Sequence, residues 1–339
     1  MSWSLHIGLG LGACISAYLA TGAVLRLLTV RAILDHANER SSHAGTVPRG
    51  GGIAVMAVII AAWCALAWLA PGKLGDSFNI TTIALLAAGL AGFSFLDDLR
   101  GLPTLQRLMM QLLAVALGCL ALPDSPVFQG LLPPAADRLA AGFCWLWFLN
   151  LFNFMDGIDG ITAVEGGSIG LGIVLITQIS GQAGELGFLS AIAAGAVIGF
   201  GFLNWRPARI FLGDVGSVGL GFLLGWLLLS LAAAGHWLPA LLLCLYYLAD
   251  ATWTLLRRMV RGEKFWQAHR SHFYQHAALA CGDHSRIALM ILACNMLLIA
   301  IALWTVLDGN QWLALILGGG TVAFLLWCFA RMKPQDGME

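Results

Sequence analysis

The sequence predicts an all-α, polytopic membrane protein, and three observations support this prediction. Of its 339 residues, 59% are hydrophobic and only 11% are charged, whereas soluble domains carry about 25% charged residues. The mean hydropathy is +0.83. Apolar runs near the length of about 20 residues that crosses a bilayer as a helix recur along the whole chain.

We interpret these runs, in chain order, as transmembrane helices. The pattern predicts about eleven of them, or ten if the least regular region, 138–180, holds one fewer. The runs are 5–28, 52–70, 80–96, 104–122, 138–153, 160–180, 186–203, 216–235, 237–256, 286–307 and 311–330.

Basic residues predict the orientation of these helices. No Lys or Arg precedes the first run, and Arg26 and Arg31 lie at its end, which is the reverse of a secretory signal. We therefore expect a retained helix with a periplasmic N-terminus and, after eleven spans, a cytoplasmic C-terminus. Most other basic residues then fall on the inside, and only Lys73 and Arg138 fall outside, as the positive-inside rule requires.

The chain reads as one membrane domain, 1–339, with its polar chemistry in the inside loops. These loops are 31–51, 97–103, 154–161, 204–217 and 257–286. The net charge of zero implies no nucleic-acid partner.

Five aspartates lie at the predicted inside ends of helices. A carboxylate at the bilayer centre costs about 3 kcal/mol on insertion scales, so lipid-facing positions are unfavourable. We expect these side chains to line a polar cleft at the cytoplasmic face. They are Asp97, Asp98, Asp156, Asp159 and Asp214.

Two of the five stretches carry candidate ligands on helix ends. In "FLDDLRGLP", the adjacent Asp97 and Asp98 repel each other unless a cation or a proton transfer compensates, although solvated helix-end acids are an alternative. In "NLFNFMDGIDG", spacings of three place Asn150, Asn153 and Asp156 on one stripe of a helix. Such oxygens suit Mg²⁺, and the alternative is polar contact between helices.

Three further stretches suggest an anion site. "NWRPARIFLGDVGS" sets Arg206 and Arg209 before Asp214, which could also simply cap the next helix. "RRMVRGEKFWQAHRSHFYQH" adds His269, Arg270 and His272 to a basic loop, which alone would indicate only topology and lipid headgroup attraction.

The remaining stretch, "NERSSHAGTVPRGGG", links the first two spans and carries Arg40, His43 and Arg49. Its three glycines, Gly50 to Gly52, precede a helix and look like an anion-holding loop. A plain basic turn is the alternative.

Together these five stretches, from about residue 31 to residue 280, resemble the polyprenyl-phosphate N-acetylaminosugar-1-phosphate transferase family. That family includes MraY-like and WecA-like enzymes, and the first loop looks closest to O-antigen-initiating, WbpL-type members. The resemblance implies transfer of a sugar phosphate from a UDP-aminosugar to polyprenyl phosphate, with release of UMP, in the bacterial inner membrane. It also implies a Mg²⁺ cofactor, for which Mn²⁺ could substitute, and a homodimer is compatible with it.

The resemblance also implies roles for individual residues. Asp97 and Asp98 look like the catalytic pair that handles the acceptor phosphate, and Asn153 and Asp214 look like the metal site. The expected substrate-binding residues are Arg40, His43, Arg49, Asn150, Asp156, Asp159, Arg206, Arg209, His269, Arg270 and His272.

Two departures from the family pattern lie in the loop that carries His272 and in the first loop. "HRSHFYQH" replaces the usual H-x-H-H, and Ala37 stands where a Pro is common. The missing "HHHFE"-like ending argues against a muramyl-pentapeptide donor. Two other functions are alternatives: an ion-coupled transporter, which would need acids near mid-span, and a membrane prenyltransferase, whose third acid is replaced by Gly101.

Overall fold

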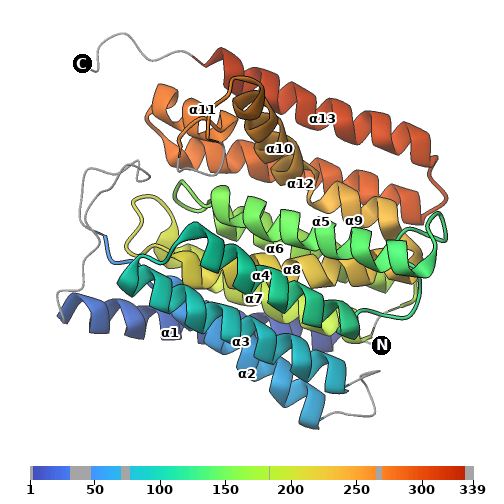
Figure 1. The fold of residues 1–339 in the computed structure, drawn as a ribbon, viewed down its shortest axis with the longest axis horizontal. Coiled ribbons are helices and arrows are strands. Elements are labelled where there is room, and N and C mark those ends of the chain that lie inside the picture. The colour runs from blue at the N-terminus through green and yellow to red at the C-terminus, as the bar shows by residue number, and fades with distance from the viewer. Residues whose placement is uncertain (1–2, 31–46, 70–76, 183, 265–268, 333–339) are drawn as a thin grey trace.

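The computed structural model describes residues 3–30, 47–69, 77–182, 184–264 and 269–332 (Figure 1). Within these ranges the backbone is helical apart from turns, loops and one isolated bridge between Arg49 and Phe211. The elements are α1 (Trp3–Val30), α2 (Gly51–Leu69), α3 (Ser77–Arg100), α4 (Thr104–Gly118), η1 (Cys119–Ala121), α5 (Pro134–Phe154), α6 (Ile161–Ile179), α7 (Glu185–Asn204), α8 (Asp214–Leu231), η2 (Ala232–His236), α9 (Trp237–Leu243), α10 (Leu245–Val260), α11 (Phe273–Cys281), α12 (His284–Val306) and α13 (Gln311–Arg331).

The prediction of an all-α polytopic membrane protein is confirmed. In the described part of the chain, 9 helices are long and apolar enough to cross a bilayer, with Asp214–Leu243 taken as one of them. The predicted number of eleven and the orientation stay predictions. The run at 138–153 forms α5, which is not among those nine.

The predicted run 237–256 is wrong as a single helix. It forms α9 and α10, which are separated at Cys244. Before it, Gly235 adopts φ 95°, a left-handed conformation that interrupts the helix between α8 and α9. Only glycine reaches that region without steric cost, and this interruption falls at the boundary predicted between the runs 216–235 and 237–256. The break at Cys244 lies within continuous apolar sequence, so hydrophobicity alone does not reveal it.

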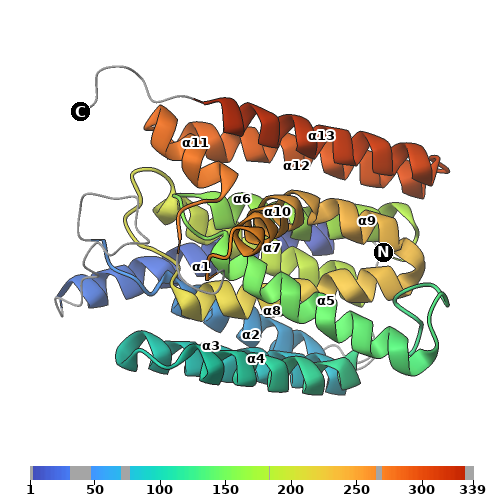
Figure 2. The ribbon, with the colours of Figure 1, turned by 45° about the horizontal axis from the view of Figure 1, so that its top comes forward.

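The helices run roughly side by side, with α12 and α13 on one side, α6 to α8 in the centre and α2 to α4 on the other side (Figure 2). Small residues allow close packing of the most buried helices. A Cβ on Gly195 or Gly199 of α7 would collide with the backbone of Gly10 or Cys14 of α1. This spacing of four is the small-residue pattern by which membrane helices approach each other.

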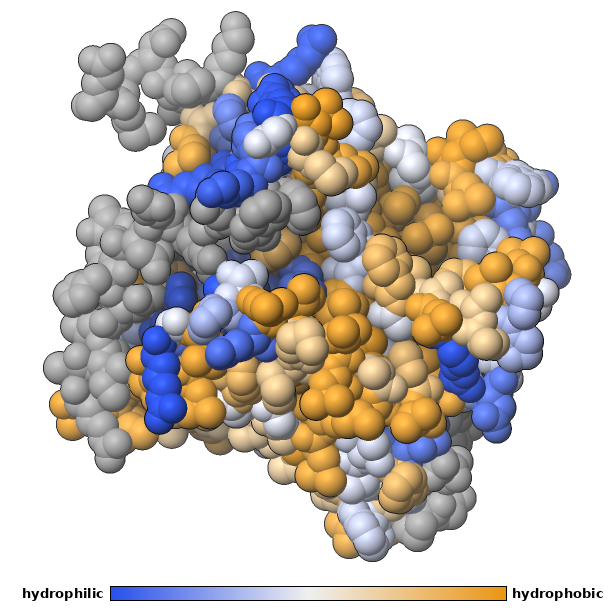
Figure 3. Space-filling view, viewed as in Figure 1, coloured by the Kyte–Doolittle hydropathy of each residue, from blue (hydrophilic) through white to orange (hydrophobic). Residues whose placement is uncertain are grey.

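Hydrophilic side chains gather toward the two ends of the helices, and a broad hydrophobic band lies between them (Figure 3). At one end, on the left in Figure 1, the last turns of α3 and α5 meet the loop before α8 and the segment before α11. We call this the site end.

Candidate active site

A cavity of about 260 Å³ opens at the site end between α3, α4, α5 and α8. Its lining is divided by chemistry. The polar residues are Ser94, Asp97, Thr104, Arg107, Gln111, Asn150, Asn153 and Asp214. The apolar and aromatic residues are Leu90, Phe93, Leu108, Phe143, Leu146, Trp147, Phe154, Val218 and Leu255.

The adjacent Asp97 and Asp98 face different partners. Asp97 is only 7% exposed, accepts a hydrogen bond from the Leu102 backbone N–H at 2.7 Å, and lies 3.4 Å from Nε of Arg107. Asp98 lies 3.9 Å from Nη1 of Arg49. The two carboxylates therefore do not point into one common binding site, because successive residues on a helix point about 100° apart.

Asn153 and Asp214 come together in the cavity from different helices, as expected. Oδ1 of Asn153 accepts a hydrogen bond from the Ser217 hydroxyl at 2.5 Å, which fixes the amide on α5 against the first turn of α8. Asp214 is the first residue of α8 and follows Gly213, whose φ of 76° turns the chain into the helix. Asn150 lines the same cavity one turn earlier on α5.

Amide and carboxylate oxygens of this kind are ligands that Mg²⁺ accepts. Among the residues that the structure describes, no three His, Cys, Asp or Glu side chains converge to form a metal cage. That is compatible with Mg²⁺, because this ion is usually held by one or two carboxylates together with substrate phosphates and water. Asn153 and Asp214 are the residues that could hold it.

Asp156 does not share the stripe predicted for it, because α5 ends at Phe154 and Asp156 lies in the following turn. Its carboxylate accepts a short hydrogen bond from the Thr162 hydroxyl. Burial raises the pKa of Asp156 to about 6, and the hydrogen bond from Thr162 and the charge of Arg49 only partly offset this effect.

Asp159 is 3% exposed, and its contacts lie inside the protein. Its carboxylate accepts a hydrogen bond from the Ala208 backbone N–H at 3.2 Å and lies 3.6 Å from Nδ1 of His284. It therefore ties the loop after α7 to the start of α12. Arg206 and Arg209, on that loop, are exposed.

The glycines 50–52 do not form the anion-holding loop that the sequence suggests. The N–H groups of Gly50 and Gly51 donate to the Phe211 carbonyl, and that of Gly52 donates to the Leu212 carbonyl. Donors used in this way are not free for a phosphate. Arg49, beside them, reaches the site through Asp98. The predicted residues Arg40 and His43 lie outside the described residues.

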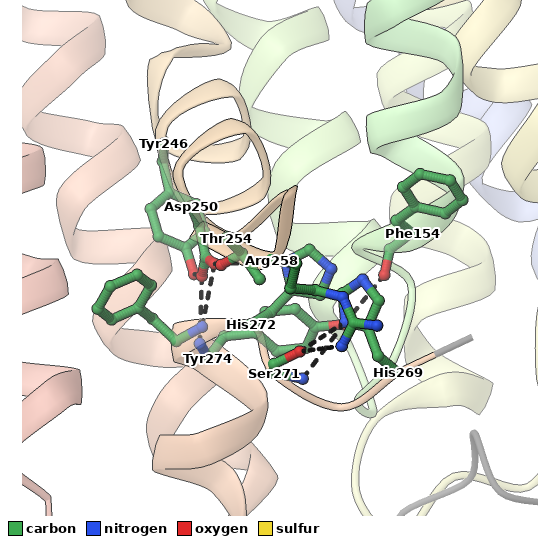
Figure 4. Close-up of polar contacts among 10 residues, drawn as sticks. Phe154, Tyr246, Asp250, Thr254, Arg258, His269, Ser271, His272 and Tyr274 are labelled. Carbon is green, nitrogen blue, oxygen red and sulfur yellow. Dashed lines mark hydrogen bonds and ion pairs between the residues drawn. The ribbon is translucent and has the colours of Figure 1, made fainter. Parts of the chain in front are cut away.

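The predicted basic segment reaches the site end through its contacts with α10 and α5 (Figure 4). Ser271 receives a hydrogen bond from Nη1 of Arg258 at 3.1 Å and lies 2.9 Å from Nδ1 of His269. His269 and Arg270 are half-buried, whereas His272 is 1% exposed and stacks on His269 with ring centroids 4.8 Å apart. His272 is thus an internal residue of the segment.

Tyr274 joins this segment to the turn after α5. Its hydroxyl donates to the Phe154 carbonyl at 3.4 Å, and it occupies the space where Gly157 would carry a Cβ. A side chain at position 157 would collide with Tyr274. This explains why the turn carrying Asp156 contains a glycine there.

Three polar residues near the site were not predicted from the sequence: Arg107, Gln111 and Asp250. Gln111 is 7% exposed, and its Oε1 has no hydrogen-bond partner. Asp250 is fully buried on α10. A charge inside the predicted span 237–256 was the available signal for Asp250, because intramembrane carboxylates are costly and tend to be functional. Arg107 lies near the start of the 104–122 run, where polar residues carry little information, and Gln111 lies near the middle of that run.

Known proteins of one family are similar to this chain. The glycosyl transferase family 4 model matches residues 78–232, which include Asp97, Asn153 and Asp214. Decaprenyl-phosphate N-acetylglucosaminephosphotransferase of Mycobacterium tuberculosis is 27% identical over 83% of this chain and 78% of its own length.

Two further relatives match most of the chain. A protein of Bacillus subtilis described as a probable undecaprenyl-phosphate N-acetylglucosaminyl 1-phosphate transferase is 26% identical, over 95% of this chain and 89% of its own. The phospho-N-acetylmuramoyl-pentapeptide-transferase of Microcystis aeruginosa is 29% identical, over 89% of each chain. With the shared motifs, these matches make the chain similar to the polyprenyl-phosphate N-acetylaminosugar phosphotransferases, and its residues 78–232 match the model of glycosyl transferase family 4.

Proposed function

We propose that the protein transfers an N-acetylaminosugar-1-phosphate from a UDP-sugar to undecaprenyl phosphate. The observation that carries this proposal is the mixed lining of the cavity, in which acidic and amide side chains occur together with apolar and aromatic ones. A phosphate on a prenyl chain likewise combines a charged head with an apolar tail. The family relatives, which are named for such transfers, add support.

In the proposed reaction, an oxygen of the acceptor phosphate attacks the phosphorus that carries the sugar. A new P–O–P linkage forms, the bond to UMP breaks, and UMP leaves with that electron pair. Arg107 carries the charge that suits the acceptor phosphate, and Asp97, 3.4 Å from Nε of Arg107, is placed to take up a proton from that phosphate. Direct attack and a covalent phospho-enzyme are both consistent with this arrangement.

The negative charge of the donor diphosphate must be neutralised, because phosphoryl transfer depends mainly on positioning the reacting groups and on stabilising their charge. We assign this role to Mg²⁺, which Asn153 and Asp214 would hold. The ion would withdraw negative charge from the diphosphate. His269 and Arg270 are the further donors proposed for it. Asp156 is proposed to adjoin the nucleotide or phosphate.

The sugar and the pathway are finer proposals. We propose a role in starting O-antigen or a related envelope glycan, because the first loop resembles that subgroup and the "HHHFE"-like ending is missing. The excess of basic residues on the same side as the site supports a cytoplasmic orientation in a bacterial inner membrane.

The test is UMP release by purified protein supplied with a panel of UDP-aminosugars. We expect release only with undecaprenyl phosphate and Mg²⁺ present, and loss of at least about 100-fold in Asp97→Asn and Asp214→Asn, as for other groups that stabilise a transition state. Chelation with EDTA should stop the reaction, and added Mg²⁺ should restore it. No UMP from any donor, or variants equal to the parent, would refute the proposal.

A further inference from the structure

Asp250 is a buried carboxylate that five groups contact, and the reaction proposed above gives it no role. It is fully buried on α10. Its two oxygens accept hydrogen bonds from the Phe273 and Tyr274 backbone N–H groups at 3.0 and 3.1 Å. The hydroxyls of Tyr246 and Thr254 approach at 3.2 and 3.4 Å, as Figure 4 shows.

The two backbone contacts make Asp250 the cap of another helix. Phe273 and Tyr274 are the first two residues of α11, whose own N-cap residue, His272, makes no side-chain cap. The first N–H groups of a helix have no partner within it and need an acceptor. Asp250 supplies that acceptor from α10, so the position of α11 is set by a side chain of a different element.

The fifth group is the His272 ring, whose Nδ1 lies 3.5 Å from the Asp250 carboxylate. Both side chains are at most 2% exposed. The contacts then continue outward, because His272 stacks on His269 and the adjoining Ser271 is bound by Arg258. The basic segment His269–His272 is therefore anchored at its C-terminal end by Asp250.

The same anchor reaches the opposite wall of the site through Tyr274. Asp250 holds the backbone N–H of Tyr274, and the Tyr274 hydroxyl donates to the Phe154 carbonyl at 3.4 Å. That carbonyl lies two residues before Asp156. One carboxylate thus sets the separation between the segment bearing His269 and Arg270 and the turn bearing Asp156.

We propose that Asp250 is a positioning residue for the sugar-nucleotide donor: it holds the His269–His272 segment at the distance from the Asp156 turn that a diphosphate requires. This inference rests on the proposed function. Asp250 touches no substrate in this account, and it acts through the segment that it caps. The acceptor end of the cavity, with Asp97 on α3 and Arg107 on α4, is held by other contacts.

The decisive experiment measures initial rates of UMP release while donor and acceptor concentrations are varied separately, for the parent and for Asp250→Asn. The amide keeps the shape of the side chain, but it loses the charge and one of two acceptor oxygens. We expect the KM for the donor to rise about tenfold, which corresponds to loss of a hydrogen bond to a charged group. The KM for the acceptor should stay within about twofold of the parent value. A tenfold change would need about 1.4 kcal/mol, and Asp250 has no proposed contact with the acceptor that would supply it.

Asp137→Asn is the matched control. Asp137 is also buried, at 3% exposure, and also accepts two backbone N–H groups, those of Val127 and Phe128 at 3.0 and 2.9 Å. Asp137 lies near the start of α5, whereas Asn153 lies near its end. The helix rises about 1.5 Å per residue, so the two side chains are far apart along it. Asp137→Asn should lower the melting temperature much as Asp250→Asn does, and leave the donor KM unchanged.

Tyr274→Phe tests the same path without touching the carboxylate, and it decides the question if Asp250→Asn does not fold. It should raise the donor KM about fivefold, the worth of one neutral hydrogen bond. In the double variant with Asp250→Asn, the rise in donor KM should be smaller than the product of the two single rises. The reason is that both substitutions disturb the same contact path from Asp250 through Tyr274 to Phe154.

The outcomes separate the two proposals. A parent protein without UMP release refutes the proposed function. An active parent whose Asp250→Asn variant shows an unchanged donor KM, or equal rises in donor and acceptor KM, overturns the positioning role. A fall in kcat alone, matching the loss of folded protein, would also overturn it, because it would make Asp250 a purely structural cap.

Discussion

Aspartates at the site end have different roles because their surroundings differ. Asp97 pairs with Arg107, Asp159 ties a loop to α12, and Asp250 caps α11. Asp156 is the exception, because burial outweighs its compensating contacts and raises its pKa to about 6. A carboxyl group with a raised pKa favours the folded state most when it is protonated.

Replacing Asp156 should therefore stabilise the substrate-free protein at neutral pH. The folded-state pKa of about 6 lies above the ordinary value of 3.8, so the stability that the protonated group contributes is lost as pH rises through this window. We expect Asp156→Asn to have a higher melting temperature than the parent at pH 7.5 and to match it near pH 4. Thermal melting in detergent at both values measures this.

The same variant should use the donor less well at pH 7.5, because Asp156 is proposed to adjoin the nucleotide or phosphate and its charge interacts with that of Asp214. A melting temperature at pH 7.5 equal to or below that of the parent would contradict the assigned cost of the buried charge. Asp137→Asn, which weakens two hydrogen bonds from backbone N–H groups of a turn to a buried carboxylate, should shift the melting temperature downward in the same assay.

At the scale of elements, the start of α2 packs on the start of α8. The Gly52 N–H donates to the Leu212 carbonyl at 2.8 Å, and a Cβ on Gly52 would collide with the backbone of Gly216. Backbone atoms cannot move aside as the end of a flexible side chain can. This contact sets where α8 begins and hence where Asp214 lies.

Gly52→Ala should accordingly lower both stability and activity. We expect a loss of about 1–3 kcal/mol, as for other overpacked sites, together with reduced UMP release as Asp214 moves. Gly89→Ala is the control, because a Cβ on this α3 glycine meets nothing within 4 Å. It should leave activity unchanged and raise stability slightly, by up to about 1 kcal/mol, as alanine replaces glycine in a helix. Equal behaviour of the two variants would contradict the close contact.

At the scale of the whole molecule, the site residues collect at one end of the bundle. Glu263 lies at this end, where Arg258 binds it at 2.9 Å beside the basic segment. Asp124 lies at the other end, 3.8 Å from Arg138 near the start of α5. These two positions report opposite sides of the membrane.

The topology can be tested by cysteine labelling in a variant lacking the eight native cysteines. In intact cells, Asp124→Cys should react with an impermeant maleimide, whereas Glu263→Cys should react only after the membrane is permeabilised. The reason is the excess of basic residues at the site end, which favours the cytoplasmic side. The reverse labelling pattern would invert the assigned orientation.

The positions of most helices follow from the sequence, because each span must satisfy its backbone hydrogen bonds internally and present apolar side chains to lipid. The predicted runs 52–70, 186–203 and 311–330 match α2, α7 and α13 within one residue at each end. The run 237–256 fails because continuous apolarity does not show where a helix breaks, and the break lies at Cys244.

The site is divided in the same way. The cost of carboxylates in lipid predicted a polar cleft that includes Asp214, and the family resemblance implied that Asn153 and Asp214 belong to one site in it. Only the tertiary structure decided that Asp97 and Asp98 face different partners, that the N–H groups of Gly50 to Gly52 are used within the fold, and that Asp250 holds α11. Membrane insertion depends on composition over about 20 residues, which is local in the sequence. Hydrogen-bond partners depend on helices brought together from distant positions, as Asp250 and Tyr274 are, so the sequence alone could not identify them.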